Sequence, residues 1–213
     1  MDNNIKWLRE EKINRTIANL KSNGMNGYFV ENRKELFKKI EEIVSEGSVV
    51  SCGGSMTLFE SGIIEYLRGG RYKFLDRYEE GLSRGDITKI YKQTFMADAY
   101  FVSTNAVTEK GELYNVDGTG NRVAAIMYGP DKVIVICGVN KIVSDLDGAI
   151  ERNRKFSAPA NAKRVGSKAP CTKTGYCMDC TSMDKICTEF TLIKGQANKD
   201  RIHVIFLNED LGY

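Results

Sequence analysis

The sequence predicts a three-layer α/β protein in which helices cover both faces of a mostly parallel sheet. Short apolar runs such as "SVVSC", "AYFVST" and "KVIVIC" alternate with helical patterns, as is typical of parallel strands buried on both faces. The length of 213 residues favours one domain with a sizeable core. Hydrophobic residues at 42% and charged residues at 28% are those of an ordinary globular protein. We therefore expect a single domain over residues 1–213.

The first expected element is an amphipathic helix over residues 4–22. Its apolar positions recur at roughly helical spacing, and they are Ile5, Leu8, Ile13, Ile17 and Leu20. Such a stripe is normally buried against another part of the protein. We expect this helix to pack on the body of the protein, with a partner-binding helix as the alternative.

A second helix is expected after the run "YFV". Asn32 and Glu35 have the spacing of a capping box, which marks a helix N-terminus. The buried stripe of this helix consists of Leu36, Ile40, Ile43 and Val44. The helix is expected to end near Gly47.

Strands and helices then alternate to the end of the chain. In order, these are strand 48–52, helix 56–69, strand 72–75, helix 86–97, strand 99–104, strand 132–137, helix 145–156 and strand 201–207. Between the strands at 99–104 and 132–137, we expect a β-hairpin that turns at Lys110 and Gly111, then a glycine turn and a short helix.

One segment departs from this composition. Residues 151–173 contain seven Lys or Arg residues and one acid, and a run of cysteines follows directly. We interpret residues 157–190 as a basic and cysteine-rich insertion of irregular structure before the last strand.

The charge distribution excludes several classes of function. The net charge is +3, from 31 basic and 28 acidic residues, too balanced for the concentrated positive field that nucleic-acid binding needs. The N-terminal segment has charges throughout and no unbroken apolar run, so we expect no signal peptide, no membrane anchor and a cytoplasmic location. In a reducing compartment, clustered cysteines more often bind metal or do redox chemistry than form structural disulfides.

The first candidate site is the turn Gly53-Gly54-Ser55, between a strand and a helix. Successive glycines let backbone N–H groups turn toward one point, which suits an anion such as a phosphate or a carboxylate. Open α/β sheets bind ligands at the carboxyl ends of their strands. The spacing is neither a Walker loop nor a dinucleotide fingerprint, so a nicotinamide cofactor is not expected. A turn that only caps the helix remains the structural alternative.

The second candidate site follows the strand at 99–104. Hydroxyl, amide, carboxylate and guanidinium groups are clustered there, and they belong to Ser103, Thr104, Asn105, Asp117, Asn121 and Arg122. Such groups on one rim suit a small carboxylate or phosphate. Glu112 or Asp117 is the candidate catalytic base, while turn chemistry on a surface hairpin is the alternative.

The third candidate site is the stretch "PCTKTGYCMDCTSMDKIC". Its four cysteines, Cys171, Cys177, Cys180 and Cys187, include a C-x-x-C pair, which readily chelates a metal through a tight turn. Four thiolates complete a tetrahedral zinc site or ligate an iron–sulfur cluster. A thiol switch and inert cysteines remain open. For His203, Cys52 and Cys137, a structural role in predicted strands is favoured.

Three long stretches resemble the LUD-domain, or lactate-utilization, proteins. These are "VVSCGGSMTLFESGIIEYL", "DAYFVSTNAVTEKGELYNVDGTGNRVAAIMYGPDKVIVICGVNKIVSDLDGAIER" and "RIHVIFLNEDLGY". The resemblance covers the chain from about residue 10 to its end. It implies a Rossmann-like sheet of the group that holds ribose-phosphate isomerases, glucosamine-phosphate deaminases and CoA transferases, with strand-end loops that bind a phosphorylated or carboxylated small molecule.

The resemblance also implies organic-acid metabolism in a redox complex, with an iron–sulfur partner protein and L-lactate oxidation as the family's link. In such a reaction, Arg122 would pair with the carboxylate, the amides of Gly53 and Gly54 would hold other oxygens, and Asp117 or Glu112 would accept the hydroxyl proton. The ferredoxin-type motifs of the iron–sulfur partner are absent from this chain, which instead carries the compact cysteine insertion.

Two alternatives belong to other functional classes. One is an isomerase or transferase acting on a phosphosugar or a CoA thioester, with Glu112 as base or nucleophile. The other is a non-catalytic metabolite or redox sensor that reports through the cysteine site. In each case the chain is a possible homo-oligomer.

Overall fold

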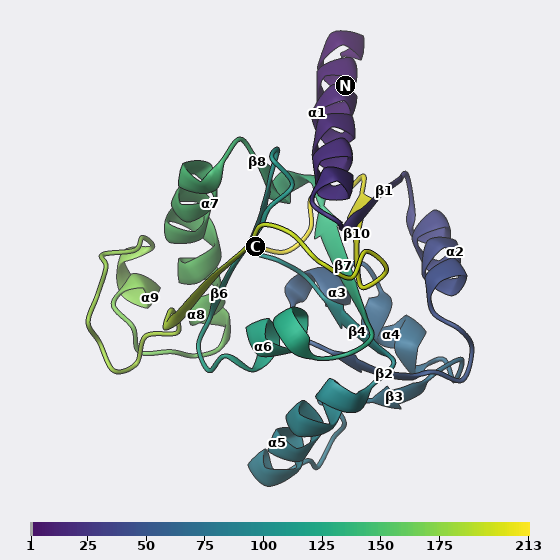
Figure 1. Cartoon of the computed structure of the whole chain (residues 1–213). Helices are drawn as coiled ribbons and strands as arrows, with labels where there is room; N and C mark the ends of the chain where they lie inside the picture. The colour runs from purple at the N-terminus through teal and green to yellow at the C-terminus, as the bar shows by residue number, and fades with distance from the viewer. Residues whose placement is uncertain (1) are drawn as a thin grey trace.

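The computed structural model describes residues 2–213, and its centre is a six-stranded sheet in the order β1-β10-β7-β4-β2-β3. All neighbouring strands of this sheet are parallel. Its strands are β1 (Asn26–Val30), β2 (Val49–Cys52), β3 (Lys73–Leu75), β4 (Ala99–Val102), β7 (Lys132–Gly138) and β10 (Ile202–Leu207). Figure 1 shows helices on both faces of this sheet, so the predicted α/β class is confirmed.

A second, four-stranded sheet has the order β8-β5-β6-β9. Its strands are β5 (Ala106–Thr108), β6 (Leu113–Asp117), β8 (Ile142–Val143) and β9 (Glu189–Ile193). The strands β5 and β6 form the expected hairpin, because they pair antiparallel on either side of the turn at Lys110 and Gly111. The pairing of β9 with β6 was not expected from sequence, because β9 is short and mostly half-exposed.

Nine α-helices are described in residues 2–213. They are α1 (Asn3–Ser22), α2 (Arg33–Ile43), α3 (Met56–Glu60), α4 (Ile63–Arg68), α5 (Arg84–Gln93), α6 (Asn121–Tyr128), α7 (Leu146–Arg152), α8 (Ala158–Arg164) and α9 (Cys171–Thr174). Short 3-10 turns cover Thr94–Met96 and Val139–Lys141, and a π-helical turn at Asn153–Ser157 joins α7 to α8. None of the helices in this part of the chain has the length and apolar character that a membrane crossing requires.

Two expected helices differ from the observed ones. The helix expected over residues 56–69 is interrupted, because Gly62 lies between α3 and α4 with a φ of 78°, in the left-handed region that favours glycine. The helix expected over 145–156 continues through the π-helical turn into α8. The insertion at 157–190 is therefore more regular than expected, with α8 and α9 inside it.

The helix α1 is buried over only part of its length. Ile13 and Leu20 lie in the core, but Ile5 and Leu8 of the expected buried stripe are 59% and 57% exposed. Figure 1 shows the N-terminal end of α1 projecting from the body of the protein. The expectation of a core-packed helix therefore holds for the second half of α1 and is wrong for the first half.

The core is divided by the central sheet. Alternate residues of β7 point to opposite faces, as in any strand. Ile134 and Ile136 pack in a cluster with α2, α3 and α4, whereas Val133 and Val135 pack in a cluster with α1 and α6. The second sheet contributes to the latter cluster. It therefore lies over the face of the central sheet that also carries α6.

Candidate functional site

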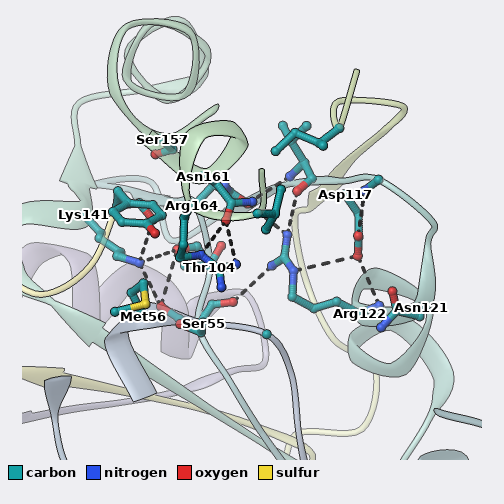
Figure 2. A pocket seen from close by; sticks show the side chains of 18 of the residues that line it. Ser55, Met56, Thr104, Asp117, Asn121, Arg122, Lys141, Ser157, Asn161 and Arg164 are labelled. Atoms are coloured by element: carbon teal, nitrogen blue, oxygen red, sulfur yellow. Dashed lines mark hydrogen bonds and ion pairs between the residues drawn. The ribbon is translucent and has the colours of Figure 1, made fainter. Parts of the chain in front are cut away.

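A cavity of about 220 Å³ lies beyond the carboxyl ends of β2, β4 and β7 (Figure 2). Three strand-end loops meet there. Gly54 and Ser55 follow β2, Ser103 directly follows β4, and Lys141 lies in the 3-10 turn after β7. The strand-end loops of a parallel sheet are the usual ligand-binding place in this kind of fold. The two loops selected from sequence therefore line one cavity, together with a third that was not selected.

The glycine turn after β2 is set by close contacts. A Cβ atom at Gly53 would lie 2.7 Å from the Tyr100 hydroxyl oxygen, so only glycine fits there. Gly53 does not itself line the cavity, whereas Gly54 and Ser55 do. The Ser55 side chain makes no capping hydrogen bond to α3, although it is the N-cap residue. Its hydroxyl is thus not occupied by the capping role that was the structural alternative.

Two polar groups lie directly above Gly54. A Cβ atom at Gly54 would meet Arg77 Nη1 at 3.5 Å and the Tyr78 hydroxyl oxygen at 3.7 Å. The Tyr78 hydroxyl is buried and has no hydrogen-bond partner within residues 2–213, which is costly for a buried polar group. The space above the glycine turn is therefore flanked by groups that a ligand could satisfy.

Arg77 and Arg164 bring positive charge to the cavity. The Arg77 guanidinium stacks over the rings of Tyr78 and Tyr91, with no carboxylate within salt-bridge distance in the described part of the chain. Arg164 Nε and Nη2 donate to Asn161 Oδ1 at 3.1 and 2.7 Å. Neither arginine is neutralised by an acid. Both side chains therefore keep donors for an anion.

Lys141 is the most buried cation of the site. Its side chain is only 1% exposed, and Nζ donates to Ser103 Oγ at 3.0 Å, to the Thr104 carbonyl at 3.2 Å and to the Tyr213 carbonyl at 3.3 Å. The Ser103 and Thr104 acceptors are uncharged, and no Asp or Glu side chain in the described residues bonds this amine. Burial therefore lowers the pKa of Lys141 to about 7, far below the usual value of a lysine. Near neutral pH, this amine exchanges its proton readily.

Arg122 lines the cavity, but its donors are occupied. Nη1 donates to the Ser103 carbonyl at 3.1 Å and to Asn115 Oδ1 at 2.6 Å. Nη2 donates to Asn105 Oδ1 at 3.0 Å and to the Val116 carbonyl at 2.8 Å. The guanidinium thereby ties β4 to the hairpin. Arg122 contributes charge and rigidity, and we no longer assign it the direct contact with a ligand carboxylate.

Asp117 is held in a similar way. Its carboxylate accepts from the backbone N–H groups of Gly118, Arg122 and Val123 at 2.7, 3.1 and 3.2 Å, and Oδ2 lies 3.8 Å from Arg122 Nε. It therefore stabilises the N-terminus of α6. Both carboxylate oxygens already accept hydrogen bonds from the backbone, so the geometry favours a positioning role over proton transfer.

The other residues selected from sequence divide into two groups. Thr104, Asn105 and Asn121 line the cavity, although Thr104 and Asn105 also make internal hydrogen bonds. Glu112 does not line it. The carboxylate of Glu112 accepts from the Thr108 hydroxyl at 3.1 Å and lies 3.5 Å from Lys194 Nζ, on the hairpin. Glu112 is therefore left out of the site proposed below.

The charges around this cavity do not balance. Four cationic side chains line it, Arg77, Arg122, Lys141 and Arg164, against the single carboxylate of Asp117. The sequence analysis missed Arg77, Lys141 and Arg164. Lys141 had a weak signal, because it follows the end of a predicted strand by only a few residues. Arg164 comes from α8, and no pattern in the sequence indicates that α8 covers this edge of the sheet.

The four cysteines of the insertion line a second cavity, of about 380 Å³. Cys171 lies in α9, Cys177 and Cys180 lie in the following loop, and Cys187 lies just before β9. Burial, together with repulsion of a thiolate by nearby Cys177, Cys171 and Cys180, raises the pKa of Cys187 to about 11. The four thiols are thus close enough to influence one another, and each is free of disulfides.

This donor set fits a metal group. Four thiolates are the ligands of structural zinc and of iron–sulfur clusters. Within residues 2–213, however, no three Cys, His, Asp or Glu side chains are close enough to hold one metal ion. The four cysteines therefore line a cavity but do not converge on a single metal position.

The model of the LUD domain family matches residues 13–207. The chain belongs to the LUD domain family. This family is associated with lactate utilization, and the match covers both the central sheet and the cysteine insertion of this LUD domain. No curated protein matches the chain.

Solved structures resemble this LUD domain at low sequence identity. A DUF162 family protein from Deinococcus radiodurans is 16% identical, with a TM-score of 0.55, over 94% of this chain and 98% of that one. A 5-methylthioribose 1-phosphate isomerase from Pyrococcus horikoshii OT3 is 15% identical, with a TM-score of 0.36, over 71% of this chain and 48% of that one. The first of these likenesses supports the fold of the whole chain.

Proposed function

We propose that this LUD domain binds a small carboxylate or phosphate metabolite in the strand-end cavity and works in organic-acid metabolism as a subunit of a redox complex. The observation that carries the proposal is the excess of positive charge. Arg77 and Arg164 lack acidic partners in the described chain, and no Asp or Glu side chain there bonds the buried Lys141 amine. For the buried Lys141, the charged form is unfavourable unless an anion enters.

The size of the cavity limits the ligand. Pockets for drug-sized molecules have volumes of about 300–1,000 Å³, and this cavity has about 220 Å³. A molecule with a few heavy atoms and one anionic group fits that volume, as a short 2-hydroxy acid does. A dinucleotide would not fit inside it.

The residues of the site have different roles in the oxidation of a 2-hydroxy acid. Arg77 and Arg164 pair with the carboxylate, because a guanidinium matches a carboxylate through two parallel hydrogen bonds. Lys141, which is protonated when the anion binds, must first lose that proton and then accepts the hydroxyl proton as a neutral amine. Arg122 and Asp117 hold the loops. Oxidation to the 2-oxo acid also releases two electrons and the proton of the C–H bond; the electrons pass one at a time to the redox partner, an iron–sulfur protein, and this proton passes to water.

The test is a binding measurement with matched variants. Calorimetry with L-lactate, pyruvate and a sugar phosphate is expected to detect binding of at least one class. Arg77→Gln should weaken that binding by about 10- to 100-fold, because a hydrogen bond to a charged group contributes about 1.5–3 kcal/mol. Arg84→Gln, an exposed arginine outside the cavity, is the control and should leave the affinity unchanged. Equal affinities for Arg77→Gln and wild type would sink the proposal.

The other functions considered have less support. An isomerase or transferase that uses Glu112 needs this carboxylate in the cavity, and Glu112 instead lies against Thr108 and Lys194 on the hairpin. We therefore do not propose Glu112 as a catalytic base or nucleophile. Turnover of a phosphosugar or a CoA thioester without a redox partner would revive that role.

A further inference from the structure

The ends of the cysteine insertion are fixed to the rest of the protein. The Ser167 hydroxyl donates to the Asp184 carbonyl at 2.6 Å, which closes the segment into a loop. At its C-terminal end, Thr188 N–H donates to the Asp117 carbonyl at 2.9 Å, and the Thr188 hydroxyl donates to the Gly118 carbonyl at 2.8 Å. Cys187 is therefore held at the start of β9, although the segment before it has little regular structure.

The walls of the four-cysteine cavity are largely apolar. The apolar or aromatic residues that line the cavity include Tyr114, Ile150, Met178, Ile186 and Phe190. Among charged groups, Arg154 and Lys185 face Asp179, and Arg154 forms an ion pair with Asp179. Positive charge thus slightly exceeds negative charge before any thiol ionises. An anionic thiolate site would be offset by these cations.

The arrangement of the four cysteines indicates whether one zinc ion or a larger group would fit between them. A zinc ion bound at about 2.3 Å from each of four sulfurs brings those sulfurs within about 4 Å of one another, which leaves no space between them. The four cysteines instead line a cavity of about 380 Å³ together with eleven other residues. Together with the absence of a three-ligand cluster in residues 2–213, this space favours an inorganic core between the sulfurs.

We propose that Cys171, Cys177, Cys180 and Cys187 bind a [4Fe–4S] cluster, with each cysteine as the ligand of one iron. Binding of the preassembled cluster forms four iron–thiolate bonds and releases the four thiol protons, with no change in the number of electrons. Because protons leave, loading is favoured as pH rises. The assignment of this cluster does not rest on the anion-binding function.

The position of the cluster gives it a specific neighbour. Ile186 lines both the four-cysteine cavity and the strand-end cavity, and a Cβ atom at Gly118 would lie 3.3 Å from the Ile186 carbonyl oxygen. Cys187 directly follows Ile186, a residue of the wall of the anion site. The cluster is placed as the immediate neighbour of whatever that site holds.

Metal and sulfide analysis tests the proposal. The full chain is purified without oxygen and reconstituted with sulfide and equal amounts of ferrous and ferric iron, which supply the oxidation state of the cluster core, and a zinc-loaded sample is prepared in parallel. Wild type is expected to hold about four iron and four sulfide per chain, with a broad visible absorption band and a paramagnetic signal after reduction. Cys180→Ser should lose most of the iron and sulfide. Cys52→Ala, a buried cysteine of the central sheet, should retain both.

Circular dichroism of every sample separates loss of the ligand from loss of the fold. If Cys180→Ser is unfolded, Cys177→Ser and Cys171→Ala supply the comparison. Stoichiometric zinc that excludes iron and sulfide from wild type would overturn the proposal. So would iron and sulfide that persist in folded Cys variants, or folded wild type that takes up no iron and sulfide.

Discussion

Lys141 shows at the scale of one residue how burial prepares a group for chemistry. An ordinary lysine is charged at neutral pH, but this one is buried, bonds no Asp or Glu side chain in the described residues and donates to hydroxyl and main-chain oxygens. Desolvation favours the neutral amine, and an incoming anion favours the ammonium. The residue therefore couples ligand binding to the uptake of a proton.

Anion affinity is expected to fall as pH rises. Below about pH 7, which is the lowered pKa of Lys141, the amine is charged in both the free and the bound protein. Above it, binding must first protonate the free amine, so affinity decreases by up to about tenfold per pH unit. Calorimetry with a carboxylate ligand, whose own charge is constant between about pH 6 and about pH 9, measures the slope.

Two variants test whether Lys141 causes the fall of anion affinity with rising pH. Lys141→Met should remove it, and Lys132→Met, at the other end of β7, should preserve it. A slope that survives in folded Lys141→Met would show that another group controls binding.

Arg122 and Arg77 show why single residues were only partly predictable from sequence. The sequence placed Arg122 at the right edge of the sheet, because a glycine turn after a hairpin has a recognisable pattern. Its four acceptors come from residues 103–116, and nothing in the spacing indicates that they consume its donors. Arg77 has no motif at all. Its availability follows from the absence of a nearby acid, which only the folded chain determines.

At the scale of the element, α1 shows that an amphipathic pattern does not ensure burial of the whole helix. The stripe continues through the whole helix, but the protein body reaches only its second half. Leu20 is completely buried, while Leu8 on the same helix is 57% exposed. The same substitution at these two positions therefore measures how far the contact extends.

Leu20→Ala is expected to lower the free energy of unfolding by about 2–5 kcal/mol, because it leaves a cavity in the core. Leu8→Ala is expected to change it by less than about 0.5 kcal/mol, as exposed positions do. Urea denaturation followed by circular dichroism measures both. A large loss for Leu8→Ala would mean that the first half of α1 is covered in solution, and the partner-binding alternative would gain support.

Elements were predictable where their local signals were strong. The apolar runs of β2, β4, β7 and β10 identified these strands, and Asn32 accepts from the Glu35 N–H at the N-terminus of α2, as the capping pattern predicted. The strand β9 was missed because "EFTLI" alternates weakly and pairs with β6 from a distant part of the chain. Such pairing leaves little trace in local sequence.

At the scale of the whole molecule, stability is distributed unevenly between the sheet and the insertion. In the central sheet, β7 and β10 have neighbours on both sides and are buried along nearly their entire length. In contrast, residues 175–187 are half-exposed or exposed. Local opening requires less free energy where few buried contacts must break.

Amide hydrogen exchange should reveal this difference. In the metal-free protein, we expect β7 and β10 to exchange slowest and residues 175–187 to exchange within the fastest class. Loading with iron and sulfide should slow exchange in 175–187 and leave the sheet unchanged, since a ligand stabilises the segment that it ties together. Mass spectrometry of peptic fragments measures both. Unchanged exchange in the insertion after loading would mean that the cluster is bound elsewhere.

The position of β10 has a consequence for biosynthesis. This strand inserts between β1 and β7, and the Tyr28 hydroxyl contacts His203 across 175 positions of sequence. While the ribosome is still translating the segment before residue 202, β1 and β7 each have an edge with no partner. Contacts so distant in sequence make folding slow, and unpaired edges invite aggregation of nascent chains. The cysteine insertion emerges during that interval, so chaperone protection and cluster delivery would have to act on a chain whose central sheet is still open.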